Sequence, residues 1–249
     1  MMTTRILRLA AFVLVLGWAQ AAAAQTADEI IEKSIAAMGG RAAFDKVKSR
    51  AMTGTISIGT PAGDLPGTIE MLNAVPNKTR MVINADLSAF GAGPLVIDQR
   101  FDGTAGYVLD TMQGNRDITG GQLEGLKNNS FPHPFLNYKA MGMSVKLGDK
   151  GKVADREALL LLFEPTKGTP IKQWVDAQTF MPVRTAIMAE IPQMGTVEQY
   201  LDPSDYRDLD GVKVPYKLTL QSSVQTVSMT LSKIEQNVPV DEKLFVKPQ

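Results

Sequence analysis

The fold is decided by one stretch near the end of the sequence, Asp205-Tyr-Arg-Asp-Leu-Asp-Gly-Val-Lys-Val-Pro215. Its Asp210-Gly211 pair is typical of a tight reversal between two antiparallel strands, because both residues tolerate the positive φ angles of such a turn. From Val212 onward apolar and polar residues alternate, so one face of this strand is buried and the other faces water. Pro215 fits only where a strand does not donate a ladder hydrogen bond. The stretch therefore predicts an antiparallel sheet with an edge.

The same alternation appears in the first half of the chain. Residues 50–58, 67–75 and 78–85 have the period of two that is typical of half-buried strands. The Asp102-Gly103 pair predicts a further hairpin. These segments together predict an antiparallel meander.

Three segments depart from this pattern. Residues 27–47 have helical spacing that is interrupted at Gly39-Gly40, and residues 122–129 suit a short helix. Residues 86–94 are loop-like. No internal repeat or change of composition divides the chain. We therefore expect a mainly β fold of the α+β class: a curved antiparallel sheet of roughly ten strands with a few short helices over its concave side.

The first 24 residues have the pattern of a cleavable secretory signal. A basic region with Arg5 and Arg8 precedes an apolar core and a small-residue site that ends at Ala24. The apolar run is shorter than the ~20 residues that span a bilayer, which argues against a membrane anchor. We predict that residues 1–24 are removed and that residues 25–249 form a single domain that is soluble in the periplasm or secreted.

Composition excludes several classes of function. The chain has 26 Lys and Arg and 26 Asp and Glu, so losing the two arginines of the signal leaves 24 − 26 = −2. This charge favours neither nucleic acid nor stable membrane insertion. The chain has no cysteine, so it can form neither a disulfide nor a lipidated N-terminal cysteine. The one histidine, His133, lies between two prolines, and we interpret it as structural or solvated rather than catalytic.

An acidic cluster around Asp205 and Asp208 resembles a calcium loop only superficially. Tyr206 and Lys217 would occupy two of the ligand positions, and neither side chain suits them. Turn-forming aspartates on a solvated hairpin explain the cluster better. A pair of carboxylates for glycoside hydrolysis stays open, although nothing in the sequence selects one pair from 26 acids. We expect no metal, no cofactor and no enzymatic activity.

The apolar residues suit an adaptable cavity. The mature chain has 13 − 2 = 11 methionines, several of them near aromatic residues in the sequence. Methionine conforms to irregular ligands, although for any single residue gap-filling in an ordinary core is the alternative. The residues assigned to a hydrophobic ligand cavity are Phe90, Leu95, Phe131, Phe135, Met141, Phe163, Trp174 and Met188.

Two more specific expectations concern that cavity. Trp174 and Phe163 lie in strand-like runs with apolar residues at successive positions, so both should point toward the same apolar interior. Residues 122–136 join an amphipathic segment to the rigid loop Phe131-Pro-His-Pro-Phe135. We expect this segment to act as a lid whose two phenylalanines bury against the sheet.

The succession of strand-turn junctions resembles the LolA-like family of periplasmic outer-membrane lipoprotein-sorting proteins. The resemblance covers nearly all of the mature chain and implies an unclosed β-barrel with helices as a lid over an apolar cavity. It rests on Pro76-Asn-Lys-Thr-Arg80, Phe101-Asp-Gly-Thr-Ala-Gly-Tyr107, Trp174-Val-Asp176, Met181-Pro-Val-Arg184, the stretch at 205–215 and Asn237-Val-Pro-Val-Asp-Glu-Lys-Leu-Phe245.

The resemblance implies a function as a non-enzymatic carrier of lipid or lipoprotein acyl chains. An alternative on the same fold is an envelope sensor or interaction module that binds a partner protein and carries little lipid. A third hypothesis, a secreted hydrolase, is disfavoured by the lack of a nucleophile motif.

Overall fold

The protein is described from a computed structural model that covers residues 25–248, apart from 61–62, 89–90 and 192–194. The predicted signal peptide, residues 1–24, lies outside this described part. No helix within the described residues is both long and apolar enough to cross a membrane.

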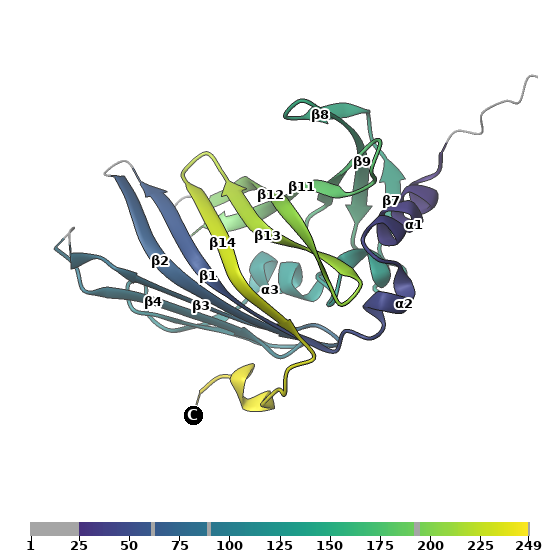
Figure 1. Cartoon of the computed structure of the whole chain (residues 1–249). Helices are drawn as coiled ribbons and strands as arrows, with labels where there is room; N and C mark the ends of the chain where they lie inside the picture. Colours follow the sequence, from purple (N-terminus) through teal and green to yellow (C-terminus); the bar gives the residue numbers. More distant parts are fainter. Residues whose placement is uncertain (1–24, 61–62, 89–90, 192–194, 249) are drawn as a thin grey trace, which may run out of the picture.

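Within the described residues, fourteen strands form one antiparallel sheet (Figure 1). Across the sheet they follow the order β6-β5-β4-β3-β2-β1-β14-β13-β12-β11-β10-β9-β7, and β8 also pairs with β9. The sheet curves but its two ends do not pair, so the mainly β, unclosed-barrel fold predicted from the sequence is confirmed, with more strands than expected. The strands are β1 (Ser49–Thr60), β2 (Gly63–Ala74), β3 (Lys78–Asp86), β4 (Pro94–Phe101), β5 (Gly106–Asp110), β6 (Arg116–Ile118), β7 (Ser144–Leu147), β8 (Gly151–Val153), β9 (Arg156–Glu164), β10 (Ile171–Asp176), β11 (Pro182–Ile191), β12 (Gly195–Leu209), β13 (Val212–Gln221) and β14 (Thr226–Gln236).

The Asp210-Gly211 turn joins β12 to β13. Asp210 and Gly211 have φ angles of 52° and 83°, as a tight hairpin requires. Pro215 pairs with Tyr206 of β12, whereas the ladder between β13 and β14 begins only at Lys217. Pro215 therefore lies beyond the end of the β13–β14 ladder. The edge predicted from Pro215 is the start of β13, which β14 does not reach, and not an outer edge of the whole sheet.

The helices are short and gather at one end of the curved sheet and across its opening. Thr26 caps the first of them with a capping box that includes Glu29. A Cβ on Gly39 would lie 2.0 Å from the Gly211 carbonyl oxygen, so the chain after this helix can approach the β12–β13 turn closely only as glycine. The helices are α1 (Ala27–Ala37), α2 (Arg41–Phe44) and α3 (Gly120–Lys127), with 3₁₀ turns η2 (Pro134–Leu136) and η3 (Glu242–Leu244).

The main hydrophobic core lies on one face of the sheet, here called the inner face. It is the face that carries Ile56 on β1, Ile69 on β2 and Phe163 on β9, all buried in the same cluster. The buried side of α1 joins this cluster through Ile30 and Ile31, which are at most 1% exposed. The helices therefore cover the inner face, as the sequence predicts.

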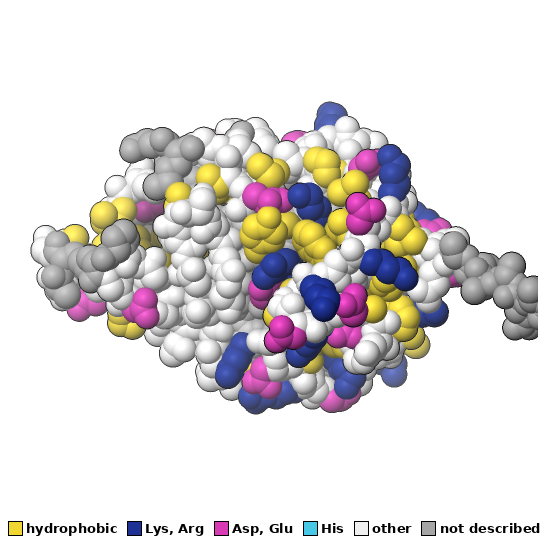
Figure 2. Space-filling model, turned by 90° about the horizontal axis from the view of Figure 1, so that it is seen from above, with side chains coloured by type: hydrophobic (Ala, Val, Ile, Leu, Met, Phe, Trp, Pro, Cys, Tyr) yellow, Lys and Arg dark blue, Asp and Glu magenta, His cyan; other side chains and the backbone are white. Residues whose placement is uncertain are grey.

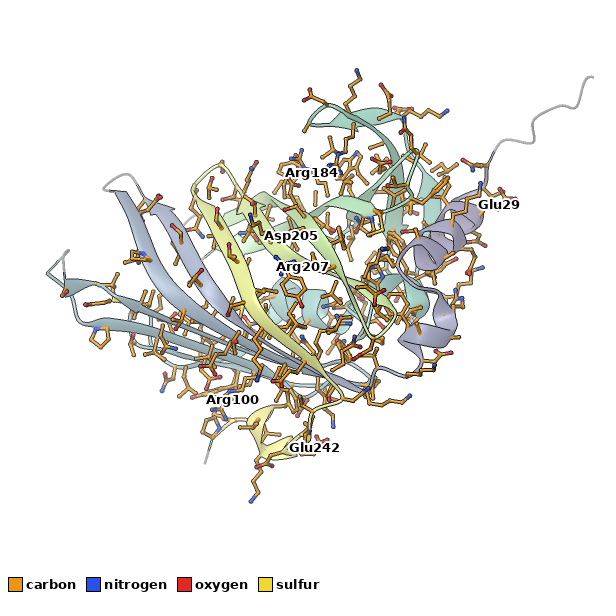
Figure 3. All side chains as sticks on the ribbon, viewed as in Figure 1. Glu29, Arg100, Arg184, Asp205, Arg207 and Glu242 are labelled. Carbon is orange, nitrogen blue, oxygen red and sulfur yellow. The ribbon has the colours of Figure 1, made fainter. Side chains whose placement is uncertain are left out.

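The opposite, outer face carries ion pairs between neighbouring strands. Arg184 on β11 lies 2.6 Å from Asp202 on β12, and Arg80 on β3 lies 2.7 Å from Asp98 on β4. Arg100, on the same strand as Asp98, lies 2.7 Å from it as well. Arg100 also donates to the Val246 carbonyl, so the C-terminal tail lies over this face (Figure 3). Figure 2 shows a face of the molecule on which hydrophobic side chains are interspersed with charged side chains of both signs.

Candidate functional site

The two ends of the open sheet are joined by residues 119–143, which we name the lid segment. It begins after β6, includes α3 and η2, and ends before β7. Asn77, in the turn between β2 and β3, donates a 2.9 Å hydrogen bond to the Leu126 carbonyl of α3, and α3 also contacts β11. The lid segment thus crosses the opening of the curved sheet from one wall to the other (Figure 1).

Few polar contacts hold α3 in place. None of its residues is fully buried. At its C-terminal end, Asn128 donates a 2.7 Å hydrogen bond to the Lys167 carbonyl, and the Phe131 amide donates to the Pro76 carbonyl at 3.3 Å. A helix with so little buried surface belongs to the part of a fold that opens most easily.

Aromatic packing fixes the second half of the lid segment. The Phe135 ring stacks on Phe163 of β9, with centroids 5.5 Å apart, and Tyr138 meets the same ring edge-on. Phe131 is 8% exposed and Phe135 1% exposed, both within the main core cluster. The expectation that these two phenylalanines bury against the sheet is confirmed.

His133 lies between those phenylalanines and supports the loop. Its Nδ1 atom accepts a 3.2 Å hydrogen bond from the Phe135 amide, and its ring packs edge-on against Phe135 and tilted against Phe44. Burial, together with the nearby charge of Arg50, lowers the pKa of His133 to about 3. The imidazole is therefore neutral and acts as a cap for η2, which matches the structural interpretation.

His133 belongs to no cluster of metal ligands among the described residues. Within the described ranges, no three His, Asp or Glu side chains come together in a way that could hold a metal ion. Asp205, from the acidic cluster, instead pairs with Arg207 at 2.8 Å on the surface (Figure 3).

A row of methionines lines the inner face beside the lid segment. In the sheet register Met52 of β1 lies opposite Met71 of β2, which in turn lies opposite Met81 of β3. All three are half-buried and pack against the main core. These three methionines were not among the cavity residues predicted from the sequence. The alternation of the strands and the β2–β3 turn together set the register that places the three side by side.

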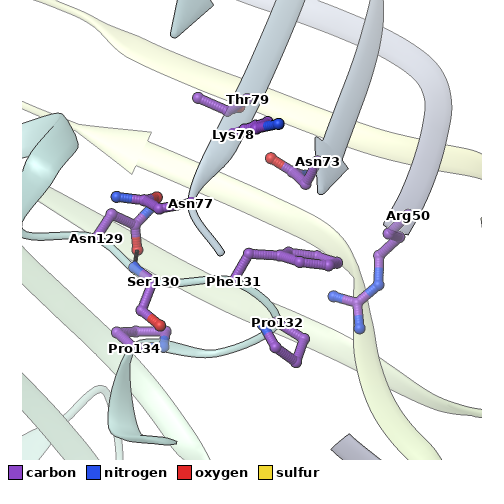
Figure 4. A pocket seen from close by; sticks show the side chains of 10 residues that line it. All are labelled: Arg50, Asn73, Asn77, Lys78, Thr79, Asn129, Ser130, Phe131, Pro132 and Pro134. Carbon is purple, nitrogen blue, oxygen red and sulfur yellow. Dashed lines mark hydrogen bonds between the residues drawn. The ribbon is translucent and has the colours of Figure 1, made fainter. Parts of the chain in front are cut away.

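Two small cavities lie under the loop of the lid segment. One of about 190 Å³ is lined by polar residues of β2 and β3 and by residues 129–134 (Figure 4). The other, of about 160 Å³, lies toward α2 and β11–β13. Arg50, Pro132 and Pro134 line both. Each cavity is smaller than the roughly 300 Å³ at which pockets for organic ligands begin, so a long-chain ligand requires the lid segment to move.

The structure brings together only part of the cavity predicted from the sequence. Phe131, Phe135 and Phe163 are buried in the main cluster, and Met141 packs against it. Leu95 is also on the inner face, but it belongs to a separate small cluster on β2, β3 and β4. Phe90 lies outside the described residues.

The placement of Trp174 and Met188 corrects the sequence analysis. Trp174 pairs with Leu160, whereas Phe163 pairs with Ile171, so strand alternation puts Trp174 and Phe163 on opposite faces. Trp174 packs instead against a small outer cluster on β8, β9 and β11. Met188 shares that outer face and is 40% exposed. β10 and β11 each carry apolar residues on both faces. The order of apolar and polar residues along these strands therefore does not indicate which face is the inner one.

Comparison with known proteins supports the same architecture. No family model matches the sequence. No curated protein sequence matches it either. Solved structures do match: a LolA superfamily protein from Nitrosomonas europaea has 14% identity and a TM-score of 0.55, covering 90% of this chain and 99% of its own. A DUF1329 family protein from Desulfovibrio piger has 14% identity and a TM-score of 0.56, covering 88% and 95%.

A third similar structure is a putative outer membrane lipoprotein-sorting protein domain from Vibrio parahaemolyticus, with 11% identity, a TM-score of 0.54, and coverage of 88% and 97%. Identities this low are informative about architecture, and all three matches extend over most of both chains. The unclosed antiparallel barrel with its lid segment therefore has the LolA-like fold.

Proposed function

We propose that residues 25–249 form a non-enzymatic periplasmic carrier that binds lipid or lipoprotein acyl chains between the inner face and the lid segment. The observation that supports it most is the row of half-buried methionines at 52, 71 and 81, which packs against the same core cluster as Phe131 and Phe135 of the lid segment, together with a lid helix that has no fully buried residue. Flexible thioether side chains adapt to an alkyl chain, and a weakly held helix can open to admit it.

The energetics fit reversible carriage. Each buried CH₂ group contributes about 0.8 kcal/mol, so a long acyl chain gains substantially from the inner face. Much of that gain is offset by the loss of translational freedom and by moving Phe131 and Phe135 out of the core. The balance gives an affinity in the micromolar range or better, and the lid becomes the element whose open and closed populations the ligand shifts.

A carrier role also agrees with the chemistry of the described side chains. The imidazole of His133 is neutral and its Nδ1 atom is already occupied as an acceptor, so it is poorly suited to act as a general base. The chain has no cysteine for a thiolate nucleophile.

The first experiment is to purify the protein from its own periplasm and analyse it by native mass spectrometry and organic extraction. We expect a chain that begins near Gln25, without a covalent lipid, accompanied by an extractable acyl compound. Recovery of a stoichiometric protein partner without lipid would favour the sensor alternative instead.

The second experiment measures lid movement. Because the chain has no cysteine, two can be introduced for spin labels, at exposed Lys127 on α3 and at exposed Thr55 on β1. Addition of palmitate should lengthen and broaden the distance distribution of this pair. A control pair at Thr55 and Lys146, both on strands, should not change. An unchanged lid pair under conditions where palmitate binds would remove the lid segment from the mechanism.

A further inference from the structure

Arg50 is a buried cation, and two of its guanidinium nitrogens have no hydrogen-bond partner among the described residues. It is the second residue of β1, on the inner face, opposite Asn73 of β2. Its residue exposure is only 9%. Its Nε and Nη2 atoms are buried, and neither forms a hydrogen bond within the described part of the chain.

An aromatic ring lies against the guanidinium. The Phe131 ring lies with its centroid 5.4 Å from the Arg50 Cζ atom (Figure 4). A cation–π contact of this kind stabilises the positive charge, but it does not accept the N–H groups that lie in the guanidinium plane. Those donors therefore still lack an acceptor.

Among the described residues, no carboxylate forms an ion pair with Arg50. The described residues that line the two cavities beside Arg50 include Lys78 and Lys213 but no Asp or Glu. Burial alone lowers the pKa of Arg50 to about 10, so the side chain is still charged at neutral pH. A buried, unpaired charge is strongly unfavourable, so its presence in a folded protein calls for an explanation.

The two cavities place Arg50 where a ligand would reach it. They lie on either side of the loop that contains Pro132 and Pro134, and Arg50 lines both of them. Outward movement of this loop would remove the Phe131 ring from the guanidinium and join the cavities above it. The in-plane donors of Arg50 would then face the enlarged cavity, with the methionine row farther along the same inner face.

We propose that Arg50 is the headgroup subsite of this cavity and that the ligand is an anionic amphiphile. Its carboxylate or phosphate oxygens accept the in-plane N–H groups of Arg50, and its alkyl chain lies along the inner face. The guanidinium fork matches the planar geometry of such oxyanions. This inference rests on the proposed function, because it assigns a polar end to the ligand of the same cavity.

The test compares ligands that differ only in charge. Palmitate and 1-hexadecanol, each below its aggregation limit, compete for the uncharged dye Nile red bound to the protein at pH 7.5. The parent should bind palmitate about tenfold or more tightly than hexadecanol, as expected when a charged hydrogen bond is formed. Arg50→Gln should abolish the preference, so that palmitate and hexadecanol bind this variant with similar affinity. Arg156→Gln removes an exposed arginine and should keep the preference.

The outcomes separate the two proposals. Equal affinities of the parent for palmitate and hexadecanol would overturn the headgroup subsite and leave the carrier function standing. Binding of neither ligand would overturn the carrier function and the subsite with it. Inorganic phosphate serves as a further probe. If phosphate stabilises the parent but not Arg50→Gln, and the parent shows no preference for palmitate, then Arg50 binds a free anion and the proposal of an amphiphilic ligand is wrong. Circular dichroism melting confirms that each variant is folded.

Discussion

Replacing Arg50 with methionine should make the protein more stable. Burial lowers the pKa of Arg50 well below its ordinary value, to about 10, and a fall of that size corresponds to about 3 kcal/mol of lost stability at 25 °C. Methionine retains much of the side-chain volume but loses the contact with Phe131, a loss of about 0.5 to 2 kcal/mol. We therefore expect a net gain of about 1 to 3 kcal/mol in the free energy of unfolding.

The pH dependence of that gain follows from the sign of the pKa change. Both the folded and the unfolded chain hold the Arg50 proton below pH 10, so the penalty is constant there. It is relieved only as the pH rises above about 10 toward the ordinary pKa of arginine. The difference between Arg50→Met and the parent should therefore be the same at pH 6 and at pH 9.

Urea unfolding followed by tryptophan fluorescence measures the effect, with calorimetry as a second readout. A gain of about 2 kcal/mol raises the melting temperature of a domain of this size by about 4 to 8 °C. Arg156→Met, at an exposed position, should change stability by less than about 0.5 kcal/mol. If Arg50→Met instead loses more than about 1 kcal/mol with an unchanged urea slope, Arg50 stabilises the fold and the reasoning from an unpaired charge is refuted.

Three further predictions test the inner face, the lid loop and the anchoring of α1. Met71→Gln should weaken binding of a fluorescent fatty acid about tenfold because it places an amide among apolar groups. Met188→Gln on the outer face should leave binding unchanged. Equal effects of the two substitutions on binding would contradict the assignment of faces. The pKa of His133 is lowered to about 3 from 6.5, so the unfolded chain binds a proton in that range that the folded chain excludes, and stability should fall as the pH drops from 6.5 toward 3. The ring signals of this one histidine should not titrate above pH 5 by NMR, and His133→Asn should flatten the pH profile of stability; titration near 6.5 would show an exposed ring. Gly39→Ala should destabilise the protein by more than about 2 kcal/mol because its Cβ clashes with the β12–β13 turn. Gly125→Ala in α3, where a Cβ meets nothing within 4 Å, should stabilise the protein by about 0.5 to 1 kcal/mol. Comparable melting temperatures for the two variants would refute the close approach of Gly39 to the β12–β13 turn.

Local sequence patterns predicted the elements of this fold well. The Asp210-Gly211 turn, the alternation in β1 to β3 and the helix that ends before Gly39-Gly40 each depend on neighbours in the chain, and each is present. The burial of Phe131 and Phe135 was also predictable, because a proline-flanked aromatic loop after a short helix has few other places to put two rings.

Residues whose role depends on distant parts of the chain were harder to predict. The run Leu159 to Leu162 is apolar at every position, so periodicity cannot say which side of β9 or β10 faces the core. The error at Trp174 has this origin. Arg50 lies near the start of a strand and resembles an ordinary surface arginine in the sequence, whereas Phe131, far along the chain, packs against it in the fold.

The pairing of β1 with β14 at the centre of the sheet has a consequence for how the chain is made. Every residue from Arg50 to Ile58 needs a neighbour that is synthesised almost 170 residues later or more. Until β14 emerges, a growing chain can form only two separate meanders, each with an unpaired edge where the other belongs, and contacts so distant in sequence form slowly. The signal pattern at residues 1–24 predicts export, and on that route the delay would keep the chain unfolded until its last strand is available.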